Sequence, residues 1–581
     1  MKKITTTSTL IRIAIALATF CIVLVVSELK YFRFDMTEEK RYTLSETSKQ
    51  VLEQLDDTIR MTVYLTGDLP MSFVKMERDV SDLLNEFQQV GGKNKVLVKF
   101  IDPQSIGDGK NSFKHTIARL HDSYGLAPYT IQEEDENGKL TQRNIIPGII
   151  VSTSKKFVTV NMLSNTRGNT PEEQINEALQ NLEYQCVKAI LQLTAEKRKN
   201  VAFLTGHGEL PLLYSYNATV SLLDIYNVDR VTSQQLLDSL DKYDALVIAE
   251  PTVQLSEQDK FVIDQYIMND GNVMFLYDNV SVSLDSLKKS SYTFALAKDL
   301  NLSDLLFNLG VRINPAILLD NQCAKIPMNV AAFGEQPRFV PVPWYYFPLF
   351  KPTKKHNITN NIDVVKSEFA STIDTLEGNG AYKKTVLLTS SAYARVVSTP
   401  TTVGFQILQS NPNKEFFNKY YVPTAVLLEG SGKSLYQSRK SPLENSGFSV
   451  PKQFQRKDES SQNRIIVVSD GDVIRNEIEV ANGDTIPKPL YYYKYASFDK
   501  RVYTGNLDFF MNAVNYLCGD SDLLSVRSRE ITIRLLNKNR IIEEKTYWQL
   551  LNIVLPILLI SLVGIVLYVV RKYRYSKKYV G

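Results

Sequence analysis

The feature that most constrains this chain is a pair of long apolar runs, one near each end. The first covers residues 10–29 and the second residues 549–570, and their few polar residues lie mainly near the edges. A helix of about 20 apolar residues can cross a hydrocarbon core of roughly 30 Å. Aromatic residues flank both runs, as is typical of membrane interfaces. We therefore predict two transmembrane helices, at 10–29 and 549–570.

The first run has the features of an anchor that is not removed. Lys2 and Lys3 supply the basic start that a secretory signal shares with an anchor. No small-x-small cleavage site follows the apolar stretch, and Phe20 before Cys21 does not suit lipoprotein processing. We expect the helix at 10–29 to stay in the mature protein.

The orientation follows from the basic C-terminal tail. Cytoplasmic loops and tails carry an excess of Lys and Arg. We therefore expect segments 1–9 and 571–581 in the cytoplasm and residues 30–548 in the periplasm, with the chain in the cell inner membrane. The basic residues that indicate this are Arg571, Lys572, Arg574, Lys577 and Lys578.

Composition argues against several classes of function. The 67 basic and 63 acidic residues leave a net charge of only +4, which gives no nucleic-acid-binding footprint. The 4 cysteines form no CxxC or disulfide framework, and the 4 histidines form no ligand cluster. We predict no metal, no cofactor, no nucleic-acid partner and no enzymatic activity.

Residues 30–165 have the pattern of a small α/β domain. Strand-like runs occur at 59–65, 96–101, around Tyr129, at 145–151 and at 157–160, with helical patterns at 73–90 and 113–121. This order suits a thioredoxin-like domain, although it has no CxxC and so no redox chemistry of that type.

A helix at 166–198 is expected to connect this domain to the next. Thr170, Pro171 and the following glutamates give an N-cap, a proline at the first helical position and a capping-box acid. Apolar residues at helical spacing, from Ile175 to Leu193, then form one stripe. Such a stripe indicates a packing face.

The next region predicts an α/β domain with a parallel sheet of flavodoxin-like or amidotransferase-like type. Buried-type strands at 201–204, 245–249 and 273–277 alternate with helices, one of them capped by Ser256. The domain begins at 199–320 and closes at 461–530, with a late strand at 465–468 and a helix at 506–517. Between these parts, 321–460 is a β-rich insertion of obscure boundaries. Residues 531–548 form a membrane-proximal segment.

The candidate site with most chemical content is the turn Gly206, His207, Gly208 and Glu209. It follows the first parallel strand, where open α/β sheets bind ligands. Glycines let the backbone approach a ligand, and His207 with Glu209 has the groups for polar contacts or acid-base chemistry. The alternative is a tight turn whose glycines serve conformation and whose histidine is hydrogen-bonded.

Two further motifs are weaker. Residues 430–434, Gly-Ser-Gly-Lys-Ser, resemble a phosphate loop, but Leu427 stands where such a loop needs glycine and Pro442 interrupts any following helix. We reject an ATP site there. Asp470 and Asp472 follow an apolar strand and are either a cation site or an Asp-Gly turn, and the turn is favoured.

Several motifs together resemble a known family. They are residues 33–37 and 41–45 directly after the first run, the turn at 204–209 and the two terminal apolar helices. The chain resembles the auxiliary, substrate-binding-like component of bacterial ABC transport systems, in particular the gliding-motility-associated GldG family of Bacteroidota. That resemblance implies a separately encoded permease and cytoplasmic ATPase as partners, and it supplies no catalytic residues.

The expected function is therefore that of a non-catalytic component that is anchored at both ends and presents its outer domains to a substrate or an envelope partner. Two other classes stay open. One is an envelope scaffold with no role in transport, and the other is an amidotransferase-like hydrolase that uses the turn at 206–209.

Overall fold

The computed structural model describes residues 43–576 apart from short gaps and two longer ones. The gaps are 107–111, 135–139, 164–170, 195–197, 283, 332–335, 355, 361, 410–411, 413–414, 445–446, 482, 491–502 and 521–543. The chain divides into Met1–Glu530 and Ile531–Gly581, and each unit is described by itself. The predicted helix at 10–29 lies outside the described residues.

The first part of the larger unit is built on a four-stranded sheet in the order β2-β1-β5-β6. Strand β1 runs parallel to β2 and antiparallel to β5, and β5 and β6 are antiparallel. Its elements are α2 (Glu46–Glu53), β1 (Ile59–Val63), α3 (Met71–Gly91), β2 (Val96–Phe100), η1 (Pro103–Ile106), α4 (Ser112–Tyr124), β3 (Tyr129–Glu134), β4 (Leu140–Ile145), β5 (Gly148–Ser152), β6 (Phe157–Asn161) and α5 (Pro171–Thr194).

Local sequence explains most of these elements. Every second residue of β1 is buried, and α3 buries one residue per turn from Phe73 to Phe87. Helix α3 stops where Gly92 takes a φ of 86°. The strand predicted at 145–151 is present as β5 but begins three residues later, because β4 ends at Ile145 and Pro147 has no N–H to donate to a ladder.

Helix α5 packs on α2, α3 and β6 and fills the same core as α3 with Leu182, Cys186 and Ile190. It also reaches the following region, since Lys188 lies 3.5 Å from a carboxylate oxygen of Asp224.

The main sheet has ten described strands in the order β15-β16-β19-β22-β23-β10-β9-β7-β8, with β17 paired to β16. Strands β8, β7, β9, β10 and β23 are mutually parallel, so the region is mixed α/β with a parallel sheet, as predicted. The parallel half comprises β7 (Asn200–Leu204), α6 (Tyr216–Leu223), β8 (Asn227–Val231), α7 (Ser233–Leu237), β9 (Ala245–Ala249), α8 (Glu257–Met268), β10 (Asn272–Leu276), β23 (Asn463–Val468), η2 (Asp472–Ile474) and α13 (Gly505–Leu517).

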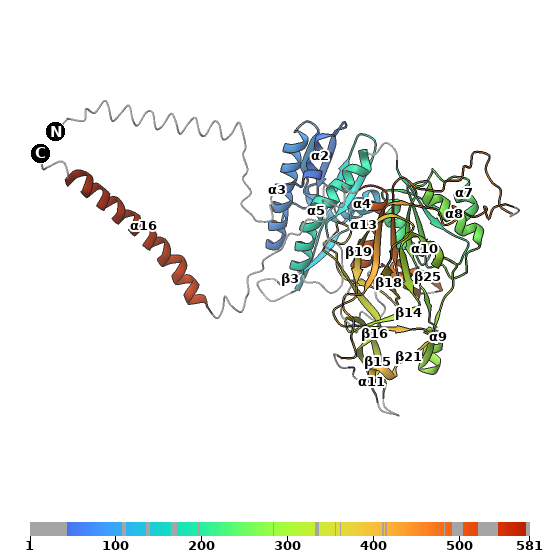
Figure 1. The fold of residues 1–581 in the computed structure, drawn as a ribbon. Helices are drawn as coiled ribbons and strands as arrows, with labels where there is room; N and C mark the ends of the chain where they lie inside the picture. The colour runs from blue at the N-terminus through green and yellow to red at the C-terminus, as the bar shows by residue number, and fades with distance from the viewer. Residues whose placement is uncertain are drawn as a thin grey trace. The chain divides into compact units, whose positions relative to one another are not determined.

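Helices cover both faces of the parallel half. On one face, α6 and α13 share a core with alternate residues of β7 and β9, such as Val201 and Val247. On the other face, α7, α8 and α10 pack on the intervening residues, such as Leu204 and Ile248 (Figure 1). The strands are buried on both faces because helices lie on both, which is why they read as continuous apolar runs.

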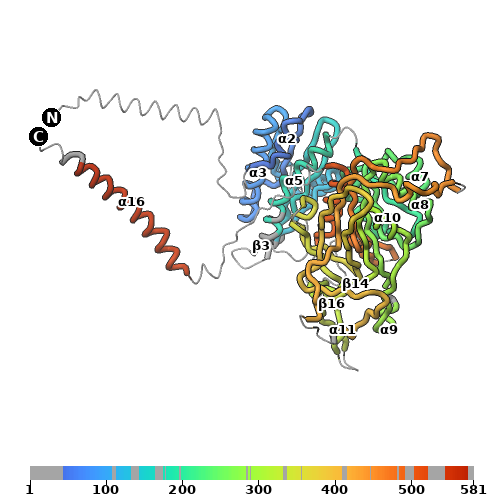
Figure 2. Tube along the Cα trace, in the orientation of Figure 1, coloured from blue at the N-terminus to red at the C-terminus, as the bar shows by residue number. Residues whose placement is uncertain are grey.

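The segment predicted as a β-rich insertion supplies strands to this same sheet. Strand β22 pairs antiparallel with β23 and β19, which carries the sheet from parallel to antiparallel pairing. At one end of the region, β14, β16, α9 and α11 gather together (Figure 2). The elements are β11 (Val280–Ser281), α9 (Leu284–Ser290), β12 (Tyr292–Ala297), α10 (Ser303–Leu309), β13 (Val311–Asn314), β14 (Ala316–Asp320), β15 (Cys323–Asn329), β16 (Phe339–Pro352), β17 (Val365–Lys366), β18 (Thr372–Thr375), β19 (Gly380–Thr389), β20 (Ala394–Ser398), β21 (Thr401–Gly404), α11 (Gln406–Gln409), β22 (Pro423–Gly432), β24 (Ile478–Ala481) and β25 (Asp484–Pro487).

The smaller unit contains one described helix, α16 (Lys545–Ser576). An 18-residue window within Lys545–Tyr573 has a mean hydropathy of 3.0, and this stretch is long and apolar enough to cross a membrane. The transmembrane helix predicted at 549–570 lies inside this stretch.

Candidate functional site

The turn predicted as a site joins the loops that follow two neighbouring parallel strands. The carbonyl oxygen of His207 accepts hydrogen bonds from the backbone N–H groups of Thr252 (2.9 Å) and Val253 (2.8 Å), which follow β9. Gly206 and Gly208 have φ values of 124° and 72°, which side chains rarely allow. A Cβ on Gly208 would also collide with the hydroxyl of Thr252. The turn therefore requires glycine for conformation and for space.

The side chain of His207 is held by two carboxylates. Its Nδ1 lies 3.1 Å from Oε1 of Glu209, and its Nε2 lies 3.1 Å from Oδ2 of Asp259 on α8. The other oxygen of Glu209 accepts the backbone N–H of His207 at 2.7 Å. His207 and Glu209 are each only 8% exposed. Both ring nitrogens are therefore occupied by contacts within the protein.

This arrangement favours a positively charged ring. Burial by itself would lower the pKa of His207, but the hydrogen bonds to Asp259 and Glu209 raise that pKa to about 9. The same contacts hold the pKa of Glu209 below its usual range, although burial acts in the opposite direction. As an imidazolium that donates both N–H groups, His207 has no free nitrogen with which to accept a proton.

Asp259 gives the turn a second connection. It is the third residue of the α8 helix and forms a reciprocal capping box with Ser256. This confirms the helix cap predicted at Ser256. Sequence reasoning paired His207 with Glu209 but missed Asp259, which lies 52 positions beyond His207. The prediction that Gly206 to Glu209 bind a ligand stays a prediction, and the observed contacts give the turn a structural role between β7 and α8.

A second group of ionisable residues gathers at the same edge of the sheet. We call Glu250, Asp278, Asp470 and Asp472 the carboxylate cluster. Glu250 follows β9, Asp278 follows β10, and the pair predicted from sequence follows β23. Because these strands are parallel neighbours, their carboxyl ends bring the four side chains together.

One arginine and two backbone N–H groups partly balance this cluster. Nη1 of Arg475 lies 2.8 Å from Glu250 and 3.2 Å from Asp472. The N–H of Gly471 donates to Asp278 at 2.8 Å, and the N–H of Glu368 donates to Asp470 at 2.9 Å.

The pKa values of these carboxyl groups show that their negative charges are not fully balanced. Burial, with the like charges around it, raises the pKa of Glu250 to about 7. The same two causes raise the pKa of Asp470 and of Asp472 well above the usual range. Within the described ranges, no group of three or more His, Cys, Asp or Glu is placed to hold a metal ion. Burial and mutual repulsion therefore favour the protonated forms of these carboxyl groups.

Sequence reasoning found only Asp470 and Asp472, since the other members are distant in the chain. A usable signal existed, because Glu250, Asp278 and Asp470 each follow an apolar strand by no more than two residues.

The segment resembling a phosphate loop is not arranged as one. Gly430 and Gly432 lie in strand β22, and Lys433 pairs with Glu459 at 3.3 Å. The hydroxyl of Ser434 donates to the buried Asp264 at 2.6 Å. A phosphate loop needs a strand that opens into a helix, and β22 instead continues the antiparallel ladder.

Comparison with known proteins places the chain in a family. Residues 198–513 match the family described as an ABC-type uncharacterized transport system, and residues 38–152 match a domain of unknown function. An uncharacterized protein of Borreliella burgdorferi is 20% identical over 551 residues, covering 92% of both chains.

Likeness to solved structures is slight. The N-terminal domain of mmIFT52 is 10% identical with a TM-score of 0.30, covering 55% of this chain and 97% of that one. A Thermoplasma acidophilum protein described as part of a GMP synthase is 12% identical with a TM-score of 0.19, covering 36% of this chain and 81% of that one. Neither carries an argument about function. The family match, in contrast, covers more than half of the chain and includes the parallel sheet, the turn at 205–209 and the carboxylate cluster, so this chain belongs to the family of auxiliary components of ABC-type transport systems.

Proposed function

We propose that the chain is a non-catalytic, membrane-anchored component of a bacterial ABC transporter, with a large periplasmic region that binds a substrate or a partner protein. The observation that carries this proposal is the family match over 198–513 in a chain that also has an apolar helix of membrane-spanning length, α16. Both ring nitrogens of His207 are engaged, which supports a non-catalytic role for the turn.

The proposed partners are a separately encoded permease and a cytoplasmic ATPase. Helix α16 carries large apolar side chains on all sides, and we propose that it docks on the permease within the membrane. The proposed arrangement also has a second anchor at 10–29 in the inner membrane. Both termini then lie in the cytoplasm. The basic residues of 571–581 support that orientation.

The finer assignments also belong to this proposal. The order β2-β1-β5-β6, with one parallel and two antiparallel pairs, supports a thioredoxin-like domain at 30–165. The parallel strands at 199–320 and 461–530 support a flavodoxin-like or amidotransferase-like sheet, with 166–198 as the connecting helix. The GldG assignment, with its role in gliding motility, rests on the resemblance of residues 33–45 and 204–209.

Affinity purification tests the proposal. The tagged full-length chain would be solubilised in mild detergent, and the proteins that accompany it would be identified and quantified by mass spectrometry. We expect a multi-span permease and an ABC ATPase in near-equal amounts. A variant with Gln549 to Val570 replaced by an unrelated transmembrane helix should stay in the membrane and lose both partners. Recovery of the chain alone, or with envelope structural proteins only, would favour the scaffold function instead.

A further inference from the structure

A cavity of about 710 Å³ opens beside the carboxyl end of β10. We call it the β10 groove. It is lined by residues that directly follow β10, by α10 and by the start of β13, with Leu435 and Arg439 from the loop after β22. Its volume lies within the range of about 300–1,000 Å³ that is usual for small-molecule sites. The β10 groove lies at the carboxyl edge of the parallel strands, the edge at which open α/β sheets bind ligands.

The floor of the groove is fixed before any ligand arrives. Tyr277, Leu306 and Ile313 are buried and present apolar surface. The hydroxyl of Tyr277 donates to the side chain of Asn279 at 3.0 Å, and Asn279 donates to the carbonyl of Ile313 at 2.8 Å. These bonds tie β10 to β13 across the floor, so a ligand would not have to order them.

The rim carries three cations. Lys298, Arg312 and Arg439 line the groove, and none of them has an ion-pair partner among the described residues. Burial raises the pKa of Glu250 and of Asp278, and the charge of Lys298 offsets part of that rise. The two arginines therefore carry most of the positive charge left for a ligand.

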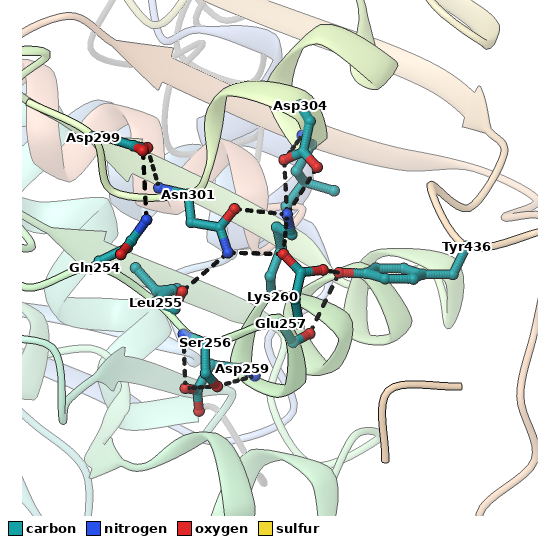
Figure 3. A network of polar contacts seen from close by, with 11 residues as sticks. Gln254, Leu255, Ser256, Glu257, Asp259, Lys260, Asp299, Asn301, Asp304 and Tyr436 are labelled. Carbon is teal, nitrogen blue, oxygen red and sulfur yellow. Dashed lines mark hydrogen bonds and ion pairs between the residues drawn. The ribbon is translucent and has the colours of Figure 1, made fainter. Parts of the chain in front are cut away.

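The acidic residues of the lining are already engaged. Asp304 accepts hydrogen bonds of 3.0 Å and 2.8 Å from the amine of Lys260, which is 1% exposed (Figure 3). Asp299 accepts from the backbone N–H of Asn301 at 3.0 Å and from Gln254. The groove therefore presents a net positive rim, since its carboxylates serve the α8–α10 network and its arginines do not.

One large apolar side chain of the groove lining is exposed to solvent. Phe307 of α10 is 55% exposed and is part of the groove lining. An aromatic ring and guanidinium groups in the lining of one cavity suit a flat or apolar group joined to an anion. We propose that the β10 groove binds a small organic anion in which a phosphate or carboxylate adjoins an aromatic or other apolar group.

Isothermal titration calorimetry of the full-length chain in detergent at low salt tests this inference, with phenyl phosphate as the probe. Inorganic phosphate and phenol serve as comparison probes, because each offers half of the chemistry. We expect saturable binding of phenyl phosphate with a Kd of about 1 mM or tighter, and weaker binding of either half. The measurement uses no transporter partner, so its outcome is independent of the proposed function.

Two variants divide the site into its parts. R312Q/R439Q should weaken phenyl phosphate binding about tenfold or more, because two charge-assisted contacts are lost. Phe307→Ser should weaken phenyl phosphate and leave inorganic phosphate unchanged. The matched control, R338Q/K419Q, removes two exposed cations elsewhere and should change neither.

Three outcomes would overturn the inference. One is the absence of saturable phenyl phosphate binding. Another is an equal loss in the control variant, which would show general charge attraction. The third is phenol binding as tightly as phenyl phosphate, which would make the groove an apolar site. An unchanged unfolding temperature would show that each variant is folded.

Discussion

A single imidazole joins two elements of this fold. His207 bridges Glu209 in its own turn and Asp259 at the start of α8, with both contacts at 3.1 Å. A neutral ring can donate through only one nitrogen, so a charged ring is needed to satisfy both carboxylates. The turn is thus stabilised by a charge that depends on pH.

We predict that stability falls as pH rises through the alkaline range because of this residue. The folded-state pKa of His207, about 9, lies above its ordinary value of 6.5. The ring therefore contributes its full stabilisation, about 3 kcal/mol, below about pH 6, and loses it as pH rises to about 10. Urea unfolding of the full chain in detergent from pH 6 to 10 would measure this loss.

Two variants isolate the effect. His207→Gln should reduce the loss of stability in this window and leave the part due to the carboxylate cluster, whose raised pKa values act in the same direction. His121→Gln, at an exposed histidine of α4, should leave the whole loss intact. A wild-type protein whose stability stays level from pH 7 to pH 10 would contradict the charged-ring interpretation.

The glycine at 208 gives a second prediction at this scale. Gly208→Ala should destabilise the protein by about 2 kcal/mol or more, because it combines a left-handed φ with a collision against Thr252. Gly447→Ala is the matched control, since a Cβ there meets nothing and the φ is unrestricted. Denaturant unfolding would compare the two, and equal effects would show that the turn is looser than its geometry indicates.

At the scale of elements, the buried amine of Lys260 links helix α8 to helix α10. Lys260 of α8 contacts Asp304 of α10 and also Glu257 and Asn301, with distances from 2.8 to 3.0 Å (Figure 3). Removing the acceptor Asp304 leaves the ammonium of Lys260 buried without its carboxylate. This costs more free energy than removing the ammonium of Lys260.

We therefore predict an order of effects. Asp304→Ala should destabilise by about 2–3 kcal/mol, because the ammonium stays buried with fewer acceptors. Lys260→Met should cost less, about 1 kcal/mol, since Glu257 and Asp304 are half-exposed and regain water. Asp241→Ala, at an exposed loop residue, is the control and should be neutral. Urea unfolding of the three variants gives the comparison, and a larger loss for Lys260→Met would reverse the argument.

Elements could be predicted from sequence where the signal is local. The strand at 245–249 and the cap at Ser256 are confirmed at the expected residues, because apolar runs and caps depend on neighbours. Strands β16, β19 and β22 had no readable boundaries, since their pairing joins segments far apart in the chain. Distance along the chain also hid Asp259, Asp278 and the Lys260 network, although each is short-range in space.

At the scale of the whole molecule, the candidate sites lie at one edge of the sheet, the carboxyl edge of its parallel strands. The order of strands reverses between β7 and β9, and the turn at 205–209 lies there. The carboxylate cluster follows β9, β10 and β23, and the β10 groove opens next to it. The antiparallel half of the sheet adds to that edge through its loops, with Glu368 at the cluster and Leu435 and Arg439 at the groove.

The described part of the smaller unit, unlike the larger unit, consists of a helix whose apolar side chains are exposed. Helix α16 exposes large apolar side chains along its length, among them Leu558, Ile560 and Leu562. Each such side chain costs about 2 kcal/mol when it faces water, so an apolar surrounding such as a membrane favours this helix. We propose that the basic residues at 571–581 keep the tail on the cytoplasmic side of the membrane.

Cysteine labelling decides that orientation. In a Cys21→Ser/Cys323→Ser background, which leaves the buried Cys186 and Cys518, single cysteines would be introduced as Gly447→Cys and Tyr573→Cys. A membrane-impermeant maleimide applied to intact cells with a permeabilised outer membrane should label the first and not the second. After lysis both should react, because both positions are exposed. Labelling of position 573 before lysis, or protection of position 447, would contradict a periplasmic sheet joined through α16 to a cytoplasmic tail.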